Sequence, residues 1–120
     1  MVENQNIQFW IEDGILHGLY KKNCMVTLEA AKEIVKLRLS MQGDKTYPCI
    51  AYLLEGEGVF KSDARKFLAI DGYIGVEKLA IITTSSVKAV IANVFITIDK
   101  PIKPTRLFTS KQKALLWLKS

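Results

Sequence analysis

Hydrophobic and polar residues alternate near the start of the chain. Ile7, Phe9 and Ile11 occupy every second position, and this period of two predicts a strand with one buried face. Asp13-Gly14 follows, a dipeptide that favours a two-residue hairpin turn because glycine tolerates a positive φ. We therefore predict an antiparallel hairpin whose second strand covers residues 15–20.

The next segment has a helical period. Thr27 is placed to cap a helix at its N-terminus, and we expect the helix to end near Gly43. Its apolar stripe consists of residues at helical spacing: Leu28, Ala31, Val35 and Leu39. Arg38 falls at the edge of this stripe, where we expect its aliphatic stem to cover apolar surface and its charge to reach solvent.

Strands and helices then alternate to the end of the chain. Two almost uninterrupted apolar segments are typical of parallel strands that are covered on both faces. The elements that follow the first helix are predicted, in chain order, as a strand at 49–54, a helix at 62–69, a strand at 78–84, a helix at 87–98 and a strand at 106–108. Thr109 and Gln112 have capping-box spacing, which predicts a final helix.

The resulting order is β-β-α-β-α-β-α-β-α. Alternating strands and helices imply right-handed crossovers. We therefore predict an α/β fold with a mostly parallel five-stranded sheet, an antiparallel N-terminal hairpin and helices packed on the sheet. At 120 residues we expect one domain over residues 1–120, in which residues 1–6 form a flexible N-terminus.

Charge is distributed unevenly along the chain. The net charge is +5, but residues 86–120 alone carry seven basic and one acidic side chain. An acidic partner or an anionic lipid surface is an alternative to a solvated surface. We do not expect nucleic-acid binding, because the basic residues belong to no groove-reading motif. Without a signal peptide or a membrane-spanning run, we expect a soluble cytoplasmic domain in which Cys24 and Cys49 are reduced.

The residues needed for catalysis are scarce. His17 is the single histidine, and its place on a strand face favours a structural role. Gly56 and Gly58 form a GxG motif, but neither a third glycine at the dinucleotide spacing nor a P-loop accompanies it. We therefore expect no enzyme, no cofactor and no metal site.

Loops at the carboxyl ends of the inner strands are the candidate edge for a ligand or a partner, because ligands of open parallel sheets bind there. The residues at this edge are Glu55, Gly56, Glu57, Gly58, Lys61, Thr84, Ser85 and Ser86. Ser62 and Ser86 are expected to cap the helices that follow.

The predicted helix at residues 87–98 is apolar on nearly all sides. A helix of this kind needs cover beyond the sheet, from neighbouring helices, a second subunit, a ligand cavity or a membrane surface. Its candidate interface residues are Val90, Ile91, Val94, Phe95 and Ile98.

This arrangement resembles the STAS-like, or SpoIIAA-like, superfamily, in particular its small stand-alone bacterial members. The features that carry the resemblance are the hairpin, the strand leading to Ser62-Asp63-Ala64-Arg65, the 78–86 strand and turn, the helix with Asn93 and Phe95, Lys100-Pro101, Arg106-Leu107-Phe108 and the segment 114–118. The regulatory branch of that superfamily carries a phosphorylated serine near this position, so the resemblance implies Ser62 as a candidate phosphorylation site, although the surrounding motif is missing.

Two functions follow as hypotheses. The first is a non-enzymatic binding or regulatory module that acts through protein–protein contacts, with a homodimer as one form of contact. The second is a carrier or sensor of a small apolar or anionic, lipid-like ligand held between the 87–98 helix and the sheet. The partner and the ligand stay open at this point.

Overall fold

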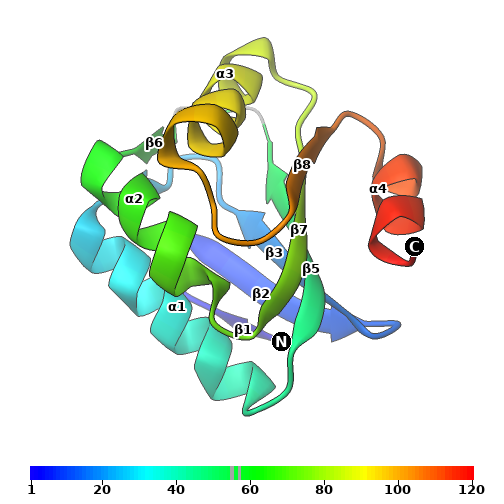
Figure 1. The fold of residues 1–120 in the computed structure, drawn as a ribbon. Coiled ribbons are helices and arrows are strands. Elements are labelled where there is room, and N and C mark those ends of the chain that lie inside the picture. The colour runs from blue at the N-terminus through cyan, green and yellow to red at the C-terminus, as the bar shows by residue number, and fades with distance from the viewer. Residues whose placement is uncertain (55, 57) are drawn as a thin grey trace.

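The structure is a computed structural model that describes residues 1–54, 56 and 58–120. Within these residues the main sheet has six strands in the order β1-β2-β3-β5-β7-β8 (Figure 1). The strands are β1 (Val2–Glu3), β2 (Ile7–Glu12), β3 (Ile15–Tyr20), β5 (Tyr47–Leu53), β7 (Val76–Ile82) and β8 (Thr105–Phe108). β3, β5, β7 and β8 are parallel, whereas β1, β2 and β3 are antiparallel. The mostly parallel α/β architecture with its antiparallel hairpin is confirmed.

The predicted hairpin joins β2 to β3. Asp13 and Gly14 have φ values of 53° and 75°, the positive pair that a two-residue type I′ turn requires. The sequence predicted five strands and a flexible segment at residues 1–6, but the structure places a strand there. β1 pairs with β2 through Val2 and Phe9. In the turn that connects them, the Asn4 side-chain oxygen accepts hydrogen bonds from the amides of Asn6 and Ile7.

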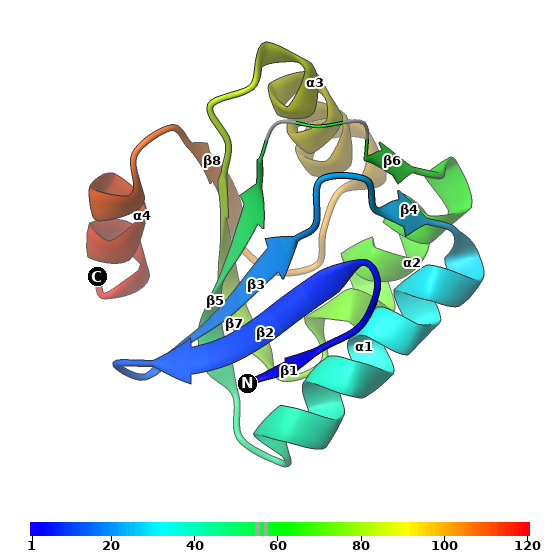
Figure 2. The same cartoon turned by 180° about the vertical axis from the view of Figure 1, so that it is seen from behind.

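Helices cover both faces of the sheet. α1 (Leu28–Gln42), α2 (Ser62–Ile70) and α3 (Ser86–Val94) lie on one face, and α4 (Lys111–Leu118) lies on the other (Figures 1 and 2). Two irregular helices, η1 (Asp71–Tyr73) and η2 (Phe95–Asp99), follow α2 and α3. A small parallel pair, β4 (Met25–Val26) with β6 (Val59–Phe60), joins the loops in front of α1 and α2.

In three of the helices, the residue at the N-cap differs by one position from the predicted cap. Thr27 caps α1 as predicted, because its hydroxyl accepts a hydrogen bond from the Ala30 amide. Ser85 rather than Ser86 caps α3, and Ser110 rather than Thr109 caps α4. Ser62 is the first residue of α2 and does not cap it; Lys61 occupies the cap position.

Arg38 corrects the expectation of a solvent-exposed charge. Its side chain is buried under η1, and it donates hydrogen bonds to the carbonyls of Gly72 and Ile74 at 3.0 and 2.9 Å and to the Gln42 amide oxygen. Gln42 in turn donates to the carbonyls of Lys45 and Gly75. Arg38 thus joins α1 to the turn between α2 and β7, a contact that helical periodicity does not reveal.

Replacing Arg38 with leucine should lower the free energy of unfolding by about 3 kcal/mol, because two buried carbonyls lose a charged donor. Urea unfolding followed by circular dichroism measures this change. The exposed Lys36→Leu on the same helix is the matched control and should change stability by less than about 0.5 kcal/mol. Equal effects of the two substitutions would contradict the assigned role.

His17 lies on the α4 face of the sheet in a cluster with the rings of Trp10 and Tyr52, whose own centroids are 6.0 Å apart. It stacks on Trp10 at 5.0 Å and on Tyr52 at 5.9 Å, and its Nδ1 shares a 3.0 Å hydrogen bond with the Tyr52 hydroxyl. Burial, and then the charge of Lys111, lower the pKa of His17 below 6.5, while Glu12 and Asp13 oppose the shift. His17 is therefore a neutral structural side chain, as its strand position suggested.

Stability should depend on the protonation of His17. Below about pH 6.5, His17 binds a proton in the unfolded chain but resists protonation in the folded protein. Lowering the pH therefore lowers the free energy of unfolding, by up to about 1.4 kcal/mol per pH unit. His17→Phe keeps the stacking but removes this titration. Urea unfolding between pH 5 and 8 should show a smaller acid loss in the variant, and parallel curves would contradict the prediction.

Candidate functional site

An apolar cavity of about 120 Å³ lies between the sheet and the helices α1, α2 and α3. Strands β2, β3, β5 and β7 form its floor, and η1 and η2 complete its walls. Representative apolar side chains of the lining are Phe9, Leu16, Leu53, Val76, Ile81 and Phe95. The cavity therefore occupies the position that the second sequence hypothesis named, between α3 and the sheet.

Small residues belong to the lining of the cavity. Gly18 of β3 and Ala51 of β5 are direct register partners and both line it. The space beside Gly18 is occupied by the Phe9 ring, since a Cβ at position 18 would lie 3.0 Å from its Cε1 atom. Ala92 of α3 and Gly72 of η1 line the side opposite the sheet.

The cavity wall contains polar side chains, and most of them are satisfied within the protein. Arg38 donates to backbone carbonyls as described above. The Tyr73 hydroxyl shares a 2.6 Å hydrogen bond with Thr105, and burial raises the pKa of Tyr73. Burial also raises the pKa of Cys49 to about 12, so its thiol is protonated at neutral pH. Tyr73 and Cys49 are therefore uncharged at neutral pH in the cavity wall.

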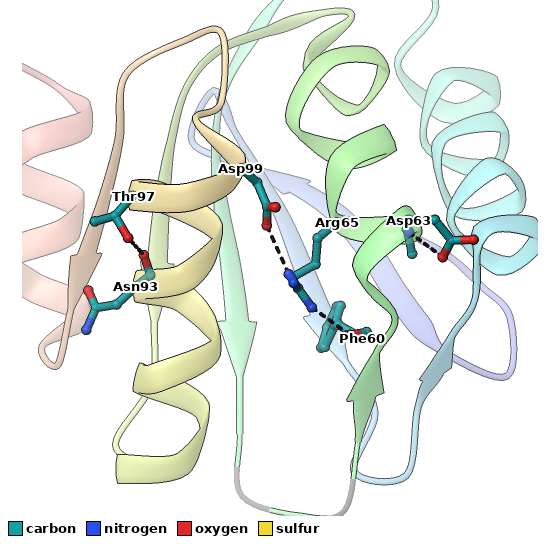
Figure 3. Close-up of polar contacts among 7 residues, drawn as sticks. Phe60, Asp63, Arg65, Asn93, Thr97 and Asp99 are labelled. Atoms are coloured by element: carbon teal, nitrogen blue, oxygen red, sulfur yellow. Dashed lines mark hydrogen bonds and ion pairs between the residues drawn. The ribbon is translucent and has the colours of Figure 1, made fainter.

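An ion pair connects α2 to η2 beside the cavity. The Arg65 Nε atom lies 2.9 Å from the Asp99 Oδ2 atom, and Arg65 also donates to the carbonyl of Phe60 at 3.1 Å (Figure 3). The Asp99 side chain is only 1% exposed, and its Oδ1 atom has no hydrogen-bond partner among the residues that the structure describes. The pair holds η2 against α2 on the side where the half-buried Phe60 and Arg65 line the cavity.

The two glycines of the GxG motif permit close packing of a loop. A Cβ at Gly56, whose φ is 145°, would lie 2.5 Å from the Lys22 carbonyl oxygen. A Cβ at Gly58 would lie 2.8 Å from the Cys24 sulfur and 3.0 Å from the Lys88 Nζ atom. Because Gly56 and Gly58 have no side chain, they can pack closely against residues 22–24 and against Lys88 of α3. Glu55 and Glu57 of the predicted edge lie outside the described residues.

Lys88 is a buried cation that the sequence reasoning missed. It lies in the first turn of α3 and donates a 2.7 Å hydrogen bond to the Gly58 carbonyl. The positive charge of Lys88 opposes the burial that raises the pKa of Cys24. The structure thus brings α3 and the Gly58 segment of the predicted edge together. Within that edge, the Ser85 hydroxyl accepts a hydrogen bond from the Lys88 amide and caps α3, whereas Thr84 and Ser86 are exposed.

The Ser62 region is only partly as expected. Ser62 and Lys61 are exposed at the start of α2, so the hydroxyl is accessible. Arg65 is held by Asp99 and the Phe60 carbonyl. Of the two basic residues nearest Ser62 in the sequence, Lys61 is therefore exposed beside it, whereas Arg65 is engaged in the ion pair.

The candidate interface residues separate into two groups. Ile91 and Phe95 line the cavity, and Phe95 stacks on Tyr73 with a ring distance of 6.5 Å. Val90 and Ile98 are 62% and 69% exposed, and Val87, 70% exposed, precedes Val90 by one helical turn. Val94 is half-buried. We call Val87, Val90 and Ile98 the outer apolar stripe.

Sequence reasoning did not locate the cavity. Gly18 interrupts an apolar strand, and an isolated glycine in a strand indicates a close approach of another group, which here is the Phe9 ring. The alignment of Gly18 with Ala51 depends on the register of β3 against β5, which a single sequence does not reveal. The Arg65–Asp99 pair joins residues 34 positions apart and left no local pattern.

Among residues 1–54, 56 and 58–120, no group of three or more histidine, cysteine, aspartate or glutamate side chains is placed to hold a metal ion. In that same part of the chain, no helix has the length and apolar character needed to cross a membrane.

Comparison with known proteins gives a family and a fold. The family model described as "Domain of unknown function (DUF7793)" matches residues 9–120. An uncharacterized DUF3478-family protein with a SpoIIAA-like fold from Shewanella loihica PV-4 is similar in structure, with a TM-score of 0.62, 19% identity and 98% of each chain covered. A protein of unknown function from Arthrobacter sp. FB24 matches at a TM-score of 0.35 and 24% identity, over 93% of this chain and 98% of the other. No curated protein matches the chain.

Proposed function

The chain belongs to the DUF7793 family and has a SpoIIAA-like fold, and we propose that it is a non-enzymatic module that binds a small apolar ligand in the cavity between the sheet and α1–α3. The observation that carries this proposal is the apolar cavity of about 120 Å³. A cavity of comparable size lined by leucine, isoleucine and phenylalanine binds benzene in another protein.

The character of the lining supports this function. Most of the side chains around the cavity are apolar, and they come from the sheet and from three helices. A small apolar molecule in this space would bury its surface against them.

The volume limits the ligand class. A molecule of benzene or toluene size fits about 120 Å³, whereas a long acyl chain does not. The sequence hypothesis allowed a lipid-like ligand. The volume of the cavity restricts the proposed ligand to a small molecule. A sensor of such a molecule agrees with this size better than a carrier of membrane lipids.

Toluene should raise the melting temperature of the protein, because a ligand that binds only the folded state stabilises it. At a free concentration of about ten times its Kd the gain is about 1.4 kcal/mol, or roughly 5 °C for a chain of this size. Differential scanning calorimetry measures the shift. In Ala51→Leu, which fills the floor of the cavity, the shift should disappear.

The matched control is Ala30→Leu, on a half-buried residue of α1 outside the cavity wall. It adds the same side-chain volume elsewhere and should retain the toluene shift. A wild-type protein that shows no shift, or an Ala51→Leu variant that retains it, would refute cavity binding.

The outer apolar stripe supports a second function, self-association or contact with a protein partner. Val87, Val90 and Ile98 expose 62–70% of their surface on one side of α3 and η2, and contiguous apolar exposure of this kind often marks an interaction surface. The inward residues Ile91 and Phe95 belong to the cavity, so the interface proposal is restricted to the outward side chains.

Sedimentation velocity over a concentration series tests the self-association. We expect the wild type to shift toward a dimer at high concentration and Val90→Asp to stay monomeric, because a charge in an apolar contact is costly to bury. Asn93→Asp, at an exposed polar position of α3, is the control and should behave as the wild type. Identical sedimentation of the wild type and Val90→Asp would exclude the stripe as a dimer contact.

A further inference from the structure

The short segment between η2 and β8 presents lysine and isoleucine side chains to solvent. Its sequence is Lys-Pro-Ile-Lys-Pro, in which Lys100 and Lys103 are exposed and Ile102 between them is 58% exposed. Ile70, at the end of α2, is 57% exposed. We call Ile70, Lys100, Ile102 and Lys103 the lysine–isoleucine surface.

Three contacts hold this segment along α2 and η1, one at its start, one in its middle and one at its end. They are the Asp99–Arg65 ion pair at 2.9 Å, the hydrogen bond from the Ile102 amide to the Ala69 carbonyl at 3.0 Å, and the Thr105–Tyr73 hydroxyl pair at 2.6 Å. Ala69 directly precedes Ile70 in α2. The middle contact therefore brings the backbone of Ile102 to the helical turn that carries Ile70, and Figure 1 shows the segment passing this end of α2.

The backbone of the segment has little conformational freedom. The rings of Pro101 and Pro104 fix their φ angles, and Lys100 has a φ of 51°, in the left-handed region that residues other than glycine rarely adopt. Single exposed apolar residues are common on protein surfaces. Here, however, an anchored backbone keeps Ile102 at the surface, close to a second exposed isoleucine and between two lysines.

The exposed charge of this region is positive on the segment itself. At α2 and its two ends, two exposed lysines are balanced by two exposed aspartates: Lys61, Lys66, Asp63 and Asp71. Lys100 and Lys103 lack such a balance, because the single carboxylate of their segment, Asp99, is 1% exposed and pairs with Arg65. The surface therefore favours a partner that is both anionic and apolar.

The backbone donors of the segment favour a lipid over a protein as this partner. Pro101 and Pro104 have no amide hydrogen, and the Ile102 amide already donates to Ala69. Free backbone donors are costly at the boundary of an apolar phase, and this segment presents few of them. Lysine side chains suit the same boundary, since their stems lie along apolar groups while their ammonium groups stay with phosphates.

We propose that the lysine–isoleucine surface docks on the interface of an anionic lipid bilayer, with Ile70 and Ile102 at the acyl boundary and Lys100 and Lys103 against the lipid phosphates. The docking is peripheral and uses the anchored segment after η2. It is independent of the cavity and of the outer apolar stripe, so it goes beyond the functions proposed above.

Sedimentation with sucrose-loaded vesicles tests the docking. One set of vesicles contains phosphatidylglycerol and phosphatidylcholine in equal amounts, and the other contains phosphatidylcholine alone. We expect the protein to sediment with the anionic vesicles at millimolar lipid and to stay in solution with the neutral ones. Raising NaCl from about 0.1 M to about 1 M shortens the Debye length from about 10 Å to about 3 Å, so the bound fraction should fall.

Two variants test the lysines and the isoleucine separately. Lys100→Gln combined with Lys103→Gln should weaken the partition coefficient about 25-fold, because each lysine at an anionic surface contributes roughly a factor of five. Ile102→Asp should weaken it at least about tenfold, because the carboxylate is repelled by the lipid and does not enter the acyl boundary. Circular dichroism of each variant confirms that it is folded.

The matched controls lie on α4, on the other face of the sheet (Figure 1). Lys113→Gln combined with Lys119→Gln removes two exposed charges, and Leu116→Asp places the same carboxylate at a 66% exposed apolar position. Both controls should change the partition coefficient by less than about threefold, because charges more than a Debye length from the lipid are screened.

Each other outcome overturns the inference. A wild type that stays in solution with the anionic vesicles does so directly, and an Ile102→Asp variant that binds like the wild type removes the isoleucine from the contact. Equal losses in the α4 controls would show attraction by net charge alone. If polyglutamate binds in place of the vesicles, and binds more weakly to the Lys100→Gln, Lys103→Gln variant, the surface takes an acidic protein and not a membrane.

Discussion

The pairing of Gly18 with Ala51 at the centre of the sheet is the constraint on which the interior depends. Parallel register places the two smallest side chains of β3 and β5 side by side on the face that the helices cover. Helices rest on a sheet through the side chains between them, so the size of those side chains decides how the helices pack. Phe9 fixes the arrangement, because its ring occupies the space that a larger residue at position 18 would need.

Three buried or half-buried cations connect the covering helices to neighbouring segments. Arg38 of α1 donates to carbonyls of the turn after α2, Arg65 of α2 donates to the Phe60 carbonyl and pairs with Asp99, and Lys88 of α3 donates to the Gly58 carbonyl. Each contact joins a helix to a different neighbouring segment. Hydrogen bonds from charged donors are stronger than neutral ones and have a defined geometry, so they fix the position of each helix relative to its neighbouring segment.

Local sequence signals predicted the architecture, because strand period, helix caps and turn dipeptides act over a few residues. The Asp13-Gly14 turn, the Thr27 cap and the alternation of strands and helices were all readable in this way. The cavity was not readable, since it depends on the register between β3 and β5. Arg38 was misassigned for the same reason: its partners lie 34 and 36 residues away in the chain.

The helix predicted to be apolar on all sides explains why two functional hypotheses arose from one segment. Ile91 and Phe95 face the cavity, while Val90 and Ile98 face outward from the same turns. A ligand inside and a partner outside would therefore act on opposite sides of one element. Any ligand that moves Phe95 also moves the exposed residues attached to the same backbone, because α3 continues directly into η2. The two proposed functions would therefore use opposite sides of one continuous helical segment, α3 with η2.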